Sequence, residues 1–289
     1  MGDVLIALAP TLVAAVAIFG ARALLVVFAC VISCVISELL FELACKKPIT
    51  ITDLSACVTG TILAYNLPVT IPIWQAVFGS IVAIVVIKQL FGGIGQNFAN
   101  PAATARIVML LAFSGTMTTW VSLDAVSSAT PLALLADSFN GITPSAPLPS
   151  LSAMILGLHG GGLGETSAVA LLIGGIYLIY RRVISWHVPV AVLATVALMT
   201  GIFGASPLYH LLSGGVMLGA FFMATDYSTT PSTNVGRVIY GIGCGAITVL
   251  IRLWGNSPEG MSFAILLMNI LTPHISNLTR NKPFGGVAA

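Results

Sequence analysis

Charged residues are scarce in this chain of 289 residues: they make up 7% of it, whereas soluble globular domains carry about 25%. The 11 Lys and Arg and the 9 Asp and Glu residues are too few to cover a water-facing surface of this size. This shortage excludes a water-soluble enzyme, a disordered protein and a nucleic-acid binder. Because hydrophobic residues make up 57% of the chain, the composition predicts a membrane protein with little mass outside the bilayer.

Cysteine is sparse as well, with five residues and no Cys-x-x-Cys pair. This pattern supplies too few ligands for an iron–sulfur or zinc site, so we expect no metal held by this chain. Cys30 and Cys34 are four residues apart and would share one helix face. We interpret the cysteines as small packing residues within helices.

Long apolar segments dominate the rest of the chain. A transmembrane helix needs about 20 apolar residues. Ten segments approach this length, at about 3–20, 22–44, 52–68, 71–91, 98–114, 164–181, 187–204, 206–225, 235–254 and 259–278. The sequence therefore predicts an all-α polytopic membrane protein with about ten transmembrane helices.

The first segment resembles the core of a signal peptide, but Asp3 stands where a basic flank belongs, so we expect a retained span.

The positive charges predict the orientation, because Lys and Arg concentrate on the cytoplasmic side of membranes. With the N-terminus inside, nine of them fall at cytoplasmic helix ends, and only Arg22 and Arg252 fall outside. The nine are Lys46, Lys47, Lys88, Arg106, Arg181, Arg182, Arg237, Arg280 and Lys282. The long stretch 115–163 contains no Lys or Arg. We therefore expect both termini in the cytoplasm and this loop outside.

Ten spans divide into five and five, and an odd number per half gives the halves opposite orientations, as in an inverted repeat. We expect a first membrane repeat at 1–114, an extracytoplasmic loop at 115–163, and a second repeat with a short cytoplasmic tail at 164–289.

Interruptions at matching places support the repeat. We expect span three to break at Thr59–Thr61 and to end at Asn66–Pro68. We expect span eight to break at Ser213–Gly215 and to end at Ala224–Asp226. Gly and Pro are also common in ordinary membrane helices, which is the alternative explanation.

Two motifs have a structural interpretation. Asn100 and Pro101 are typical of a helix start, with Asn100 as the N-cap and Pro101 as the first helical residue. The alternating glycines of Gly241–Gly245 indicate small residues that let two helices approach closely.

Glu38 and Glu42 lie four residues apart on one face of the second span, with Lys46 four residues further on. Two interpretations stay open. The residues form an interfacial ladder in which Glu42 pairs with Lys46, or they form a cation site, since ionisable residues at membrane depth are costly and tend to be functional.

The glycine run Gly160–Ser167 leads into the sixth span and also has two interpretations. A helix that begins here would present free N–H groups and a positive dipole end to a phosphate or an anionic flavin. Alternatively, the glycines form a flexible re-entry into the membrane.

The outer loop contains Asp124, Ser127, Ser128 and Thr130, followed by Pro131. As bare chemistry this is an ordinary polar turn. The stretch resembles, however, the covalent flavin-attachment motif of the RnfD/NqrB family of membrane subunits, with Ser128 at the usual Gly position. Four further blocks resemble family segments in the same order: Gly92–Ala102, Gly164–Ser167, Phe221–Asp226 and Pro258–Asn269. The length of the chain favours the RnfD branch.

The resemblance implies a cofactor, FMN, esterified through its phosphate to Thr130. Its expected neighbours are Asp124, Ser127, Ser128, Glu165 and Thr166. We expect Glu165 to cap a helix or to hydrogen-bond a polar neighbour. The relationship to NqrB also suggests a second, non-covalent flavin (riboflavin) in the helix bundle.

The resemblance further implies a subunit of an ion-translocating ferredoxin:NAD⁺ oxidoreductase (Rnf) complex in the bacterial cytoplasmic membrane. Such a subunit relays electrons through the flavin and couples this relay to Na⁺ or H⁺ transport, but it is not catalytic alone. The implied partners are the lipid bilayer and the other Rnf proteins, RnfA, RnfB, RnfC, RnfE and RnfG.

Glu38, Glu42 and Asp226 are our candidates for the ion pathway. The family resembles urea transporters in its inverted-repeat helical fold. The alternative function is therefore a urea-transporter-like channel or a secondary transporter without redox chemistry.

Overall fold

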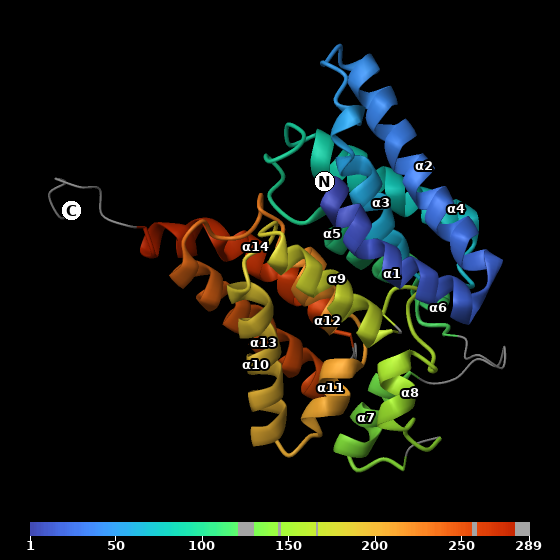
Figure 1. The fold of residues 1–289 in the computed structure, drawn as a ribbon, viewed down its shortest axis with the longest axis vertical. Helices are drawn as coiled ribbons and strands as arrows, with labels where there is room; N and C mark the ends of the chain where they lie inside the picture. Colours follow the sequence, from blue (N-terminus) through green and yellow to red (C-terminus); the bar gives the residue numbers. More distant parts are fainter. Residues whose placement is uncertain (121–129, 144–145, 166, 256–258, 281–289) are drawn as a thin grey trace, which may run out of the picture.

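The computed structural model of the chain describes residues 1–120, 130–143, 146–165, 167–255 and 259–280 (Figure 1). Within these residues all regular structure is helical. Four of the described helices are long and apolar enough to cross a membrane: α1 (Gly2–Phe19), α2 (Ala21–Ala44), α13 (Asn234–Trp254) and α14 (Met261–Leu278). The predicted all-helical membrane protein is confirmed at this level.

Shorter apolar helices occupy most of the other predicted spans. They are α3 (Ser55–Tyr65), α4 (Ile73–Ile81) with its π-helical continuation η2 (Val82–Gln89), α5 (Pro101–Ala112), α9 (Ala168–Tyr180) and α10 (His187–Ile202). The predicted eighth span consists of three pieces: α11 (Pro207–Leu212), α12 (Val216–Leu218) and the π-helical η3 (Gly219–Met223). The remaining short helices are η1 (Ile51–Asp53), α6 (Ser114–Met117), α7 (Pro131–Phe139) and α8 (Leu151–Leu156).

The predicted helix breaks have mixed outcomes. The break at Ser213–Gly215 is confirmed, and Gly214 there has a positive φ of 64°. The break expected at Thr59–Thr61 is wrong, because α3 continues through it and ends at Tyr65. The start of α5 is confirmed: Asn100 Oδ1 accepts a hydrogen bond from Ala103 N at 3.0 Å, and Pro101 is the first helical residue.

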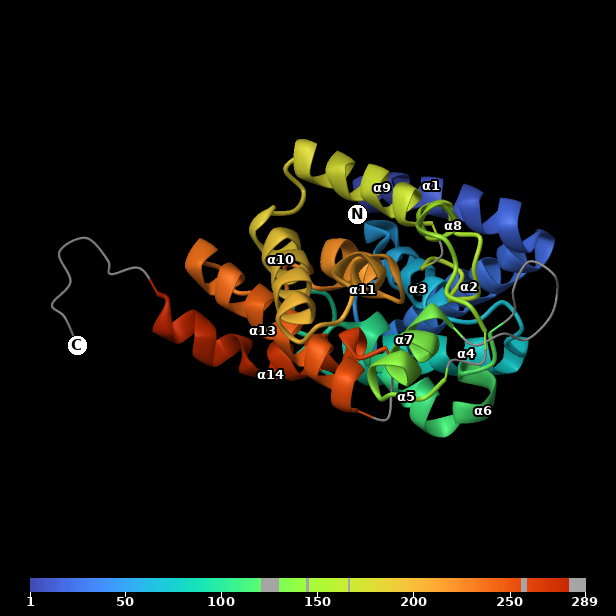
Figure 2. The same ribbon diagram turned by 90° about the horizontal axis from the view of Figure 1, so that it is seen from below.

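The helices of the two halves of the chain pair with one another. α1, the first helix, packs along α9, and α5 packs against α14. Figure 2 shows α9 lying over α1 on one side of the molecule. Within the halves, α2 contacts α3 and α4, while α10 contacts α11 and α13. The first and last spans of each half therefore form contacts across the molecule.

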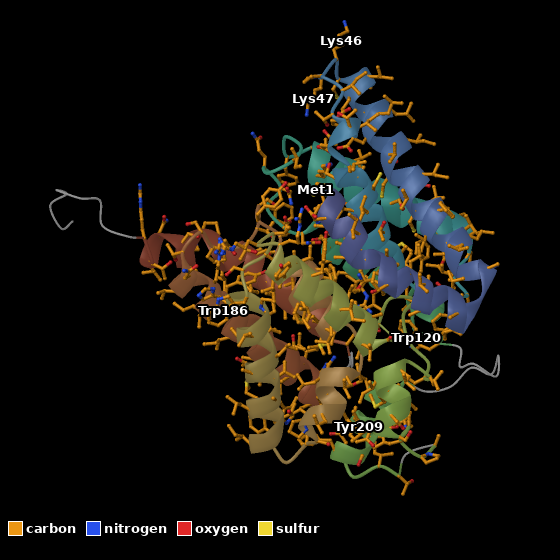
Figure 3. All side chains as sticks on the ribbon, viewed as in Figure 1. Met1, Lys46, Lys47, Trp120, Trp186 and Tyr209 are labelled. Carbon is orange, nitrogen blue, oxygen red and sulfur yellow. The ribbon has the colours of Figure 1, made fainter. Side chains whose placement is uncertain are left out.

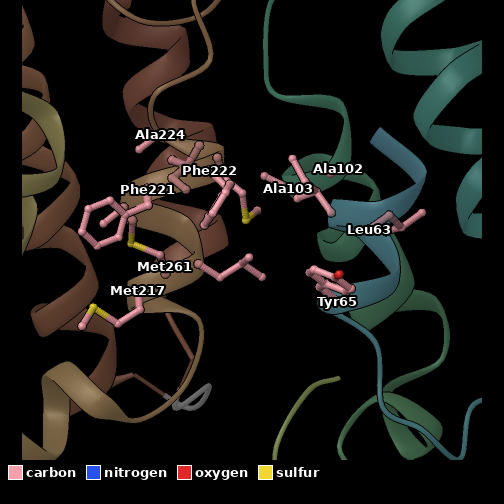
Figure 4. Packing of buried hydrophobic residues seen from close by; sticks show 14 of the residues in the cluster. Leu63, Tyr65, Ala102, Ala103, Met217, Phe221, Phe222, Ala224 and Met261 are labelled. Carbon is pink, nitrogen blue, oxygen red and sulfur yellow. The ribbon is translucent and has the colours of Figure 1, made fainter. Parts of the chain in front are cut away.

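The hydrophobic core lies largely between these halves. Leu63, Tyr65 and Ala103 face Met217, Phe221 and Met261 across it (Figure 4). Polar contacts cross the same boundary, because Asn100 Nδ2 donates to Met223 O at 3.1 Å and Asn66 Nδ2 approaches Met223 Sδ at 3.6 Å. The start of α5 is thus fixed to the end of η3.

Glycines allow the closest helix contacts. A Cβ added at Gly245 on α13 would lie 2.9 Å from Val192 O on α10, and one at Gly241 would lie 3.0 Å from Val188 O. This confirms the packing interpretation of Gly241–Gly245. A Cβ at Gly174 on α9 would lie only 2.1 Å from Ala7 O on α1.

Lys46 and Lys47 lie at the opposite end of the molecule from Tyr209 (Figure 3). At the end where Tyr209 is found, α8 contacts α11 and α7 contacts α13 (Figure 1), and Tyr209 Oη donates to Pro149 O at 3.2 Å. The segment that holds Thr130 therefore lies away from the paired lysines.

Candidate functional site

Thr130 is the N-cap of α7. Its Oγ1 accepts a hydrogen bond from Ala133 N at 3.2 Å, and Pro131 is the first helical residue. Thr followed by Pro is a favourable helix start, because the hydroxyl pairs with a free N–H group and Pro lacks the N–H that would have no partner. Asp124, Ser127 and Ser128, which precede Thr130 in the motif, lie outside the described residues, as does Thr166.

Thr130 lines a cavity of about 10 Å³, the size of a single water site. Glu165 lies in the same wall, so the structure brings these two predicted site residues together. The complete lining is Thr130, Pro131, Leu132, His159, Gly160, Gly161, Glu165, Gly214 and Glu259. The cavity is too small to enclose a flavin ring. It is a small space next to the Thr130 side chain.

The glycine run lies against the end of α3. Leu163 N donates to Leu67 O at 3.1 Å, and Gly164 N donates to Tyr65 O at 2.9 Å. A Cβ at Gly164 would lie 2.3 Å from Tyr65 Cβ, so only glycine fits. Helix α9 begins at Ala168, with Ser167 as its N-cap, and not at 164 as expected.

Glu165 forms a buried ion pair with Arg106. The distance from Arg106 Nη2 to Glu165 Oε1 is 3.1 Å, and the same Nη2 contacts Glu259 Oε2. The polar neighbour expected for Glu165 is therefore a charged one. Arg106 lies in the middle of α5 and is 3% exposed, so its assignment to a cytoplasmic helix end is wrong.

A second arginine lies beside this cluster. Arg252 is buried, and its guanidinium donates to His210 O at 2.5 Å and to Ser213 O at 2.9 Å. Arginine near the end of a helix satisfies carbonyls that have lost their helical partners. Arg252 thus stabilises the break between α11 and α12 and also interacts electrostatically with Glu165 and Glu259.

Glu38 and Glu42 have separate partners. Glu38 is buried and pairs with Lys88 Nζ at 2.6 Å, while Gln89 Nε2 donates to the same carboxylate oxygen at 2.7 Å. Glu42 accepts from the backbone N of Thr50 at 3.1 Å and from its hydroxyl at 2.5 Å. The expected pair between Glu42 and Lys46 is therefore wrong. Lys88 lies in the last turn of η2, at a helix end as expected, but its charge is buried.

Asp226 follows the end of η3 and lines a cavity of about 140 Å³. Lys88, Asn97 and Asn100 line it too, so it lies where the two halves meet. Burial raises the pKa of the Asp226 carboxyl, and hydrogen bonds from Ser228 and Thr229 oppose this rise. Of the three ion-path candidates, Asp226 lines this cavity, whereas Glu38 and Glu42 do not. Lys88, the partner of Glu38, also lines it.

Residues 1–285 match the family described as NQR2, RnfD, RnfE. The chain belongs to this family. Family membership thus covers nearly the whole chain and agrees with the blocks on which the resemblance rested.

Named relatives within the family are similar over almost their full lengths. The chain is 50% identical to the D subunit of the Na⁺-translocating ferredoxin:NAD⁺ oxidoreductase complex of Acetobacterium woodii, covering 99% of this chain and 90% of that protein. It is 42% identical to the D subunit of the proton-translocating ferredoxin:NAD⁺ oxidoreductase complex of Clostridium ljungdahlii, covering 99% and 91%. It is 37% identical to the D subunit of the ion-translocating oxidoreductase complex of Halorhodospira halophila, covering 99% and 90%.

Sequence reasoning missed the charge cluster around Arg106. The family block Pro258–Asn269 contains Glu259, but no local pattern connects it to Arg106, which is 153 residues away. The signal that could have found the cluster is the position of Arg106 within its span, as the sixth residue of α5. An arginine inside a membrane span is costly, so it predicts a buried partner of opposite charge.

Proposed function

We propose that this chain is the RnfD component of an ion-translocating ferredoxin:NAD⁺ oxidoreductase complex in a bacterial cytoplasmic membrane. The observation that carries the proposal is 50% identity over 99% of the chain to the D subunit of such a complex. Its partners are then the other components of the complex, RnfA, RnfB, RnfC, RnfE and RnfG. The chain relays electrons within the assembly and does not catalyse the overall reaction alone.

FMN attached to Thr130 is the second part of the proposal. The described hydrogen bond of Thr130 Oγ1 is one that it accepts, so an ester at this oxygen would leave the cap of α7 in place. The phosphate would also lie at a helix N-terminus, where negative charge is favoured. When bound, the flavin supplies the redox chemistry. Thr130 holds the group in place, and Glu165 and Glu259 form the nearby wall.

We also propose the finer membrane arrangement: ten spans, a five-plus-five inverted repeat at 1–114 and 164–289, cytoplasmic termini, and the 115–163 segment outside. The pairing of α1 with α9 and of α5 with α14 supports the repeat, because these are the first and last spans of each half. The positions of Lys46 and Lys47 opposite Tyr209 support the orientation.

The cavity at Asp226 is our candidate for the ion path and for the second, non-covalent flavin. It lies between the halves, where such folds bind ions and substrates. Its volume of about 140 Å³ is below the 300–1,000 Å³ of typical ligand pockets, so riboflavin would require it to open. The names of the relatives specify Na⁺ in one case and protons in another, and either ion suits a carboxylate.

The attachment is tested by in-gel flavin fluorescence of the denatured chain. Thr130→Ala should abolish the fluorescence while the chain still inserts into the membrane, and Thr130→Ser should keep part of it because a hydroxyl remains. Thr119→Ala is the matched control, since Thr119 lies in the same outer segment and its hydroxyl donates to Gly115 O; it should keep full fluorescence.

Fluorescence that persists in Thr130→Ala would rule out this attachment site. A wild-type complex without any covalent flavin would instead favour the channel or transporter without redox chemistry.

A further inference from the structure

Arg106 is a buried cation whose charged partners come from the other half of the chain. Its Nη2 contacts the carboxylates of Glu165 and Glu259, and its Nη1 donates to Ser262 Oγ at 3.1 Å. An arginine within a membrane span is costly unless it is paired. Glu165 precedes α9, and Glu259 precedes α14. One guanidinium therefore connects the last span of the first half to two helix starts of the second.

Both carboxylates that contact Arg106 also line the cavity at Thr130. Space for Glu165 comes from the break in the eighth span, because a Cβ at Gly215 would lie 2.8 Å from Glu165 Oε1. Two carboxylates thus face the position where the proposed function places a phosphate and a flavin.

The charges of this cluster balance. With all four groups ionised, the formal charges of Arg106, Arg252, Glu165 and Glu259 sum to zero. Burial raises the pKa of the Glu259 carboxyl, and the charge of Arg106 opposes this rise. Without Arg106, and with both carboxylates ionised, the wall beside Thr130 would carry a net negative charge. Charges interact strongly where water is excluded, so that wall would repel the negative charge that a flavin gains with an electron.

We propose that Arg106 is a positioning residue of the flavin site: it holds Glu165 and Glu259 against the cavity wall and cancels their charge, so that a flavin on Thr130 accepts electrons readily. This inference rests on the proposed function. The electron comes from the preceding carrier of the complex and resides on the flavin. Arg106 is neither oxidised nor deprotonated.

The test is a redox titration of the covalent flavin in the purified complex. Arg106→Gln should disfavour one-electron reduction at least tenfold, which corresponds to about 59 mV for a one-electron couple. Glu165→Gln removes a negative charge and should shift the potential upward. The double variant Arg106→Gln with Glu165→Gln should return toward wild type, because it removes one charge of each sign. An unchanged potential in Arg106→Gln overturns the proposal.

A matched control separates this effect from general loss of a buried ion pair. Lys88 is 3% exposed, as Arg106 is, and pairs with Glu38, but it does not line the Thr130 cavity. Lys88→Gln should leave the potential of the covalent flavin unchanged; an equal shift in that variant overturns the proposal. Arg106→Lys should restore part of the potential, since lysine keeps the charge but lacks the planar fork.

If Arg106→Gln does not accumulate in the membrane, Glu165→Gln is compared with the double variant. The double variant removes Arg106 and Glu165 together, so neither is left without the other. A higher potential in Glu165→Gln supports the role of Arg106, and equal potentials overturn it. Wild-type complex that lacks covalent flavin removes the attachment proposal and this inference together. Wild-type complex that carries flavin but responds to none of these changes removes this inference alone.

Discussion

Lys88 and Glu38 show how individual charges are accommodated in this chain. Lys88 Nζ donates to Glu38 Oε1 and also to Ser55 Oγ, at 2.6 Å in both cases. Gln89 adds a third hydrogen bond to the network, and Glu38 is 0% exposed. Removing one partner of a buried pair leaves the other charge without compensation, whereas removing both does not.

We therefore predict that Glu38→Met lowers the free energy of unfolding by about 3–5 kcal/mol. Glu38→Met combined with Lys88→Met should recover most of this loss, because no charge is left unpaired. Thermal unfolding of the purified protein, followed by tryptophan fluorescence, measures both. A double variant no more stable than Glu38→Met would contradict this explanation.

Sequence reasoning placed some of these residues close to one another and mistook the surroundings of others. Thr130 and Glu165 were expected to be neighbours, and the structure places them around one cavity. Arg106 was assigned to a helix end but lies within α5, and Lys88 lies at a helix end but is buried, because a count of charges along the chain contains no information on depth. Their partners are distant in sequence, so local patterns of three or four residues do not reveal them.

At the scale of helices, small residues decide how closely two elements approach. Gly174 on α9 leaves no room for a Cβ against Ala7 O on α1. Gly201 on α10 is different, because its nearest neighbour, Pro207 Cγ, would lie 3.6 Å from an added Cβ. The two glycines are both within helices, so they form a matched pair for substitution.

Gly174→Ala should destabilise the protein by about 1–3 kcal/mol, the usual cost of overpacking. Gly201→Ala should be neutral or stabilising by up to about 1 kcal/mol, because alanine favours helix without a clash. Thermal unfolding in one detergent compares the two. Equal effects would show that the α1–α9 contact is looser than described.

The helix breaks explain where sequence patterns succeed. At Ser213–Gly215 the prediction is confirmed, since Gly214 adopts a left-handed backbone conformation that ends a helix. At Thr59–Thr61 the prediction is wrong. The hydroxyls of Thr59 and Thr61 donate hydrogen bonds to the carbonyls of Ser55 and Cys57, at 3.0 and 2.8 Å, and the helix continues. Gly60 serves packing instead, because a Cβ there would lie 2.8 Å from Val31 Cα.

At the scale of the whole molecule, buried charges change the orientation argument without reversing it. Lys88, Arg106 and Arg252 are buried in the structure and give no information about loops. Of the nine Lys and Arg expected at the cytoplasmic side, seven then remain, against Arg22 alone outside. The excess of Lys and Arg on the expected cytoplasmic side, from which the orientation is inferred, therefore remains.

We therefore predict that reporter fusions after Ala136 and at the C-terminus report opposite sides of the membrane, the first outside and the second inside. A phosphatase and a fluorescent reporter at each position provide the measurement. Both fusions on one side would contradict an odd number of crossings between them, and the five-plus-five repeat with it.

The ion pair between Arg106 and its two glutamates has a consequence for biosynthesis. The ribosome makes α5 well before it makes Glu165 and Glu259, the latter 153 residues later. A newly inserted α5 therefore holds an uncompensated guanidinium, which costs about 2.5–3.5 kcal/mol at the centre of a membrane helix. Glu165 is made before Glu259, so Arg106 can gain its first carboxylate at the start of α9 and its second only at the start of α14. The ion pair therefore forms in two stages as the second half of the chain is made.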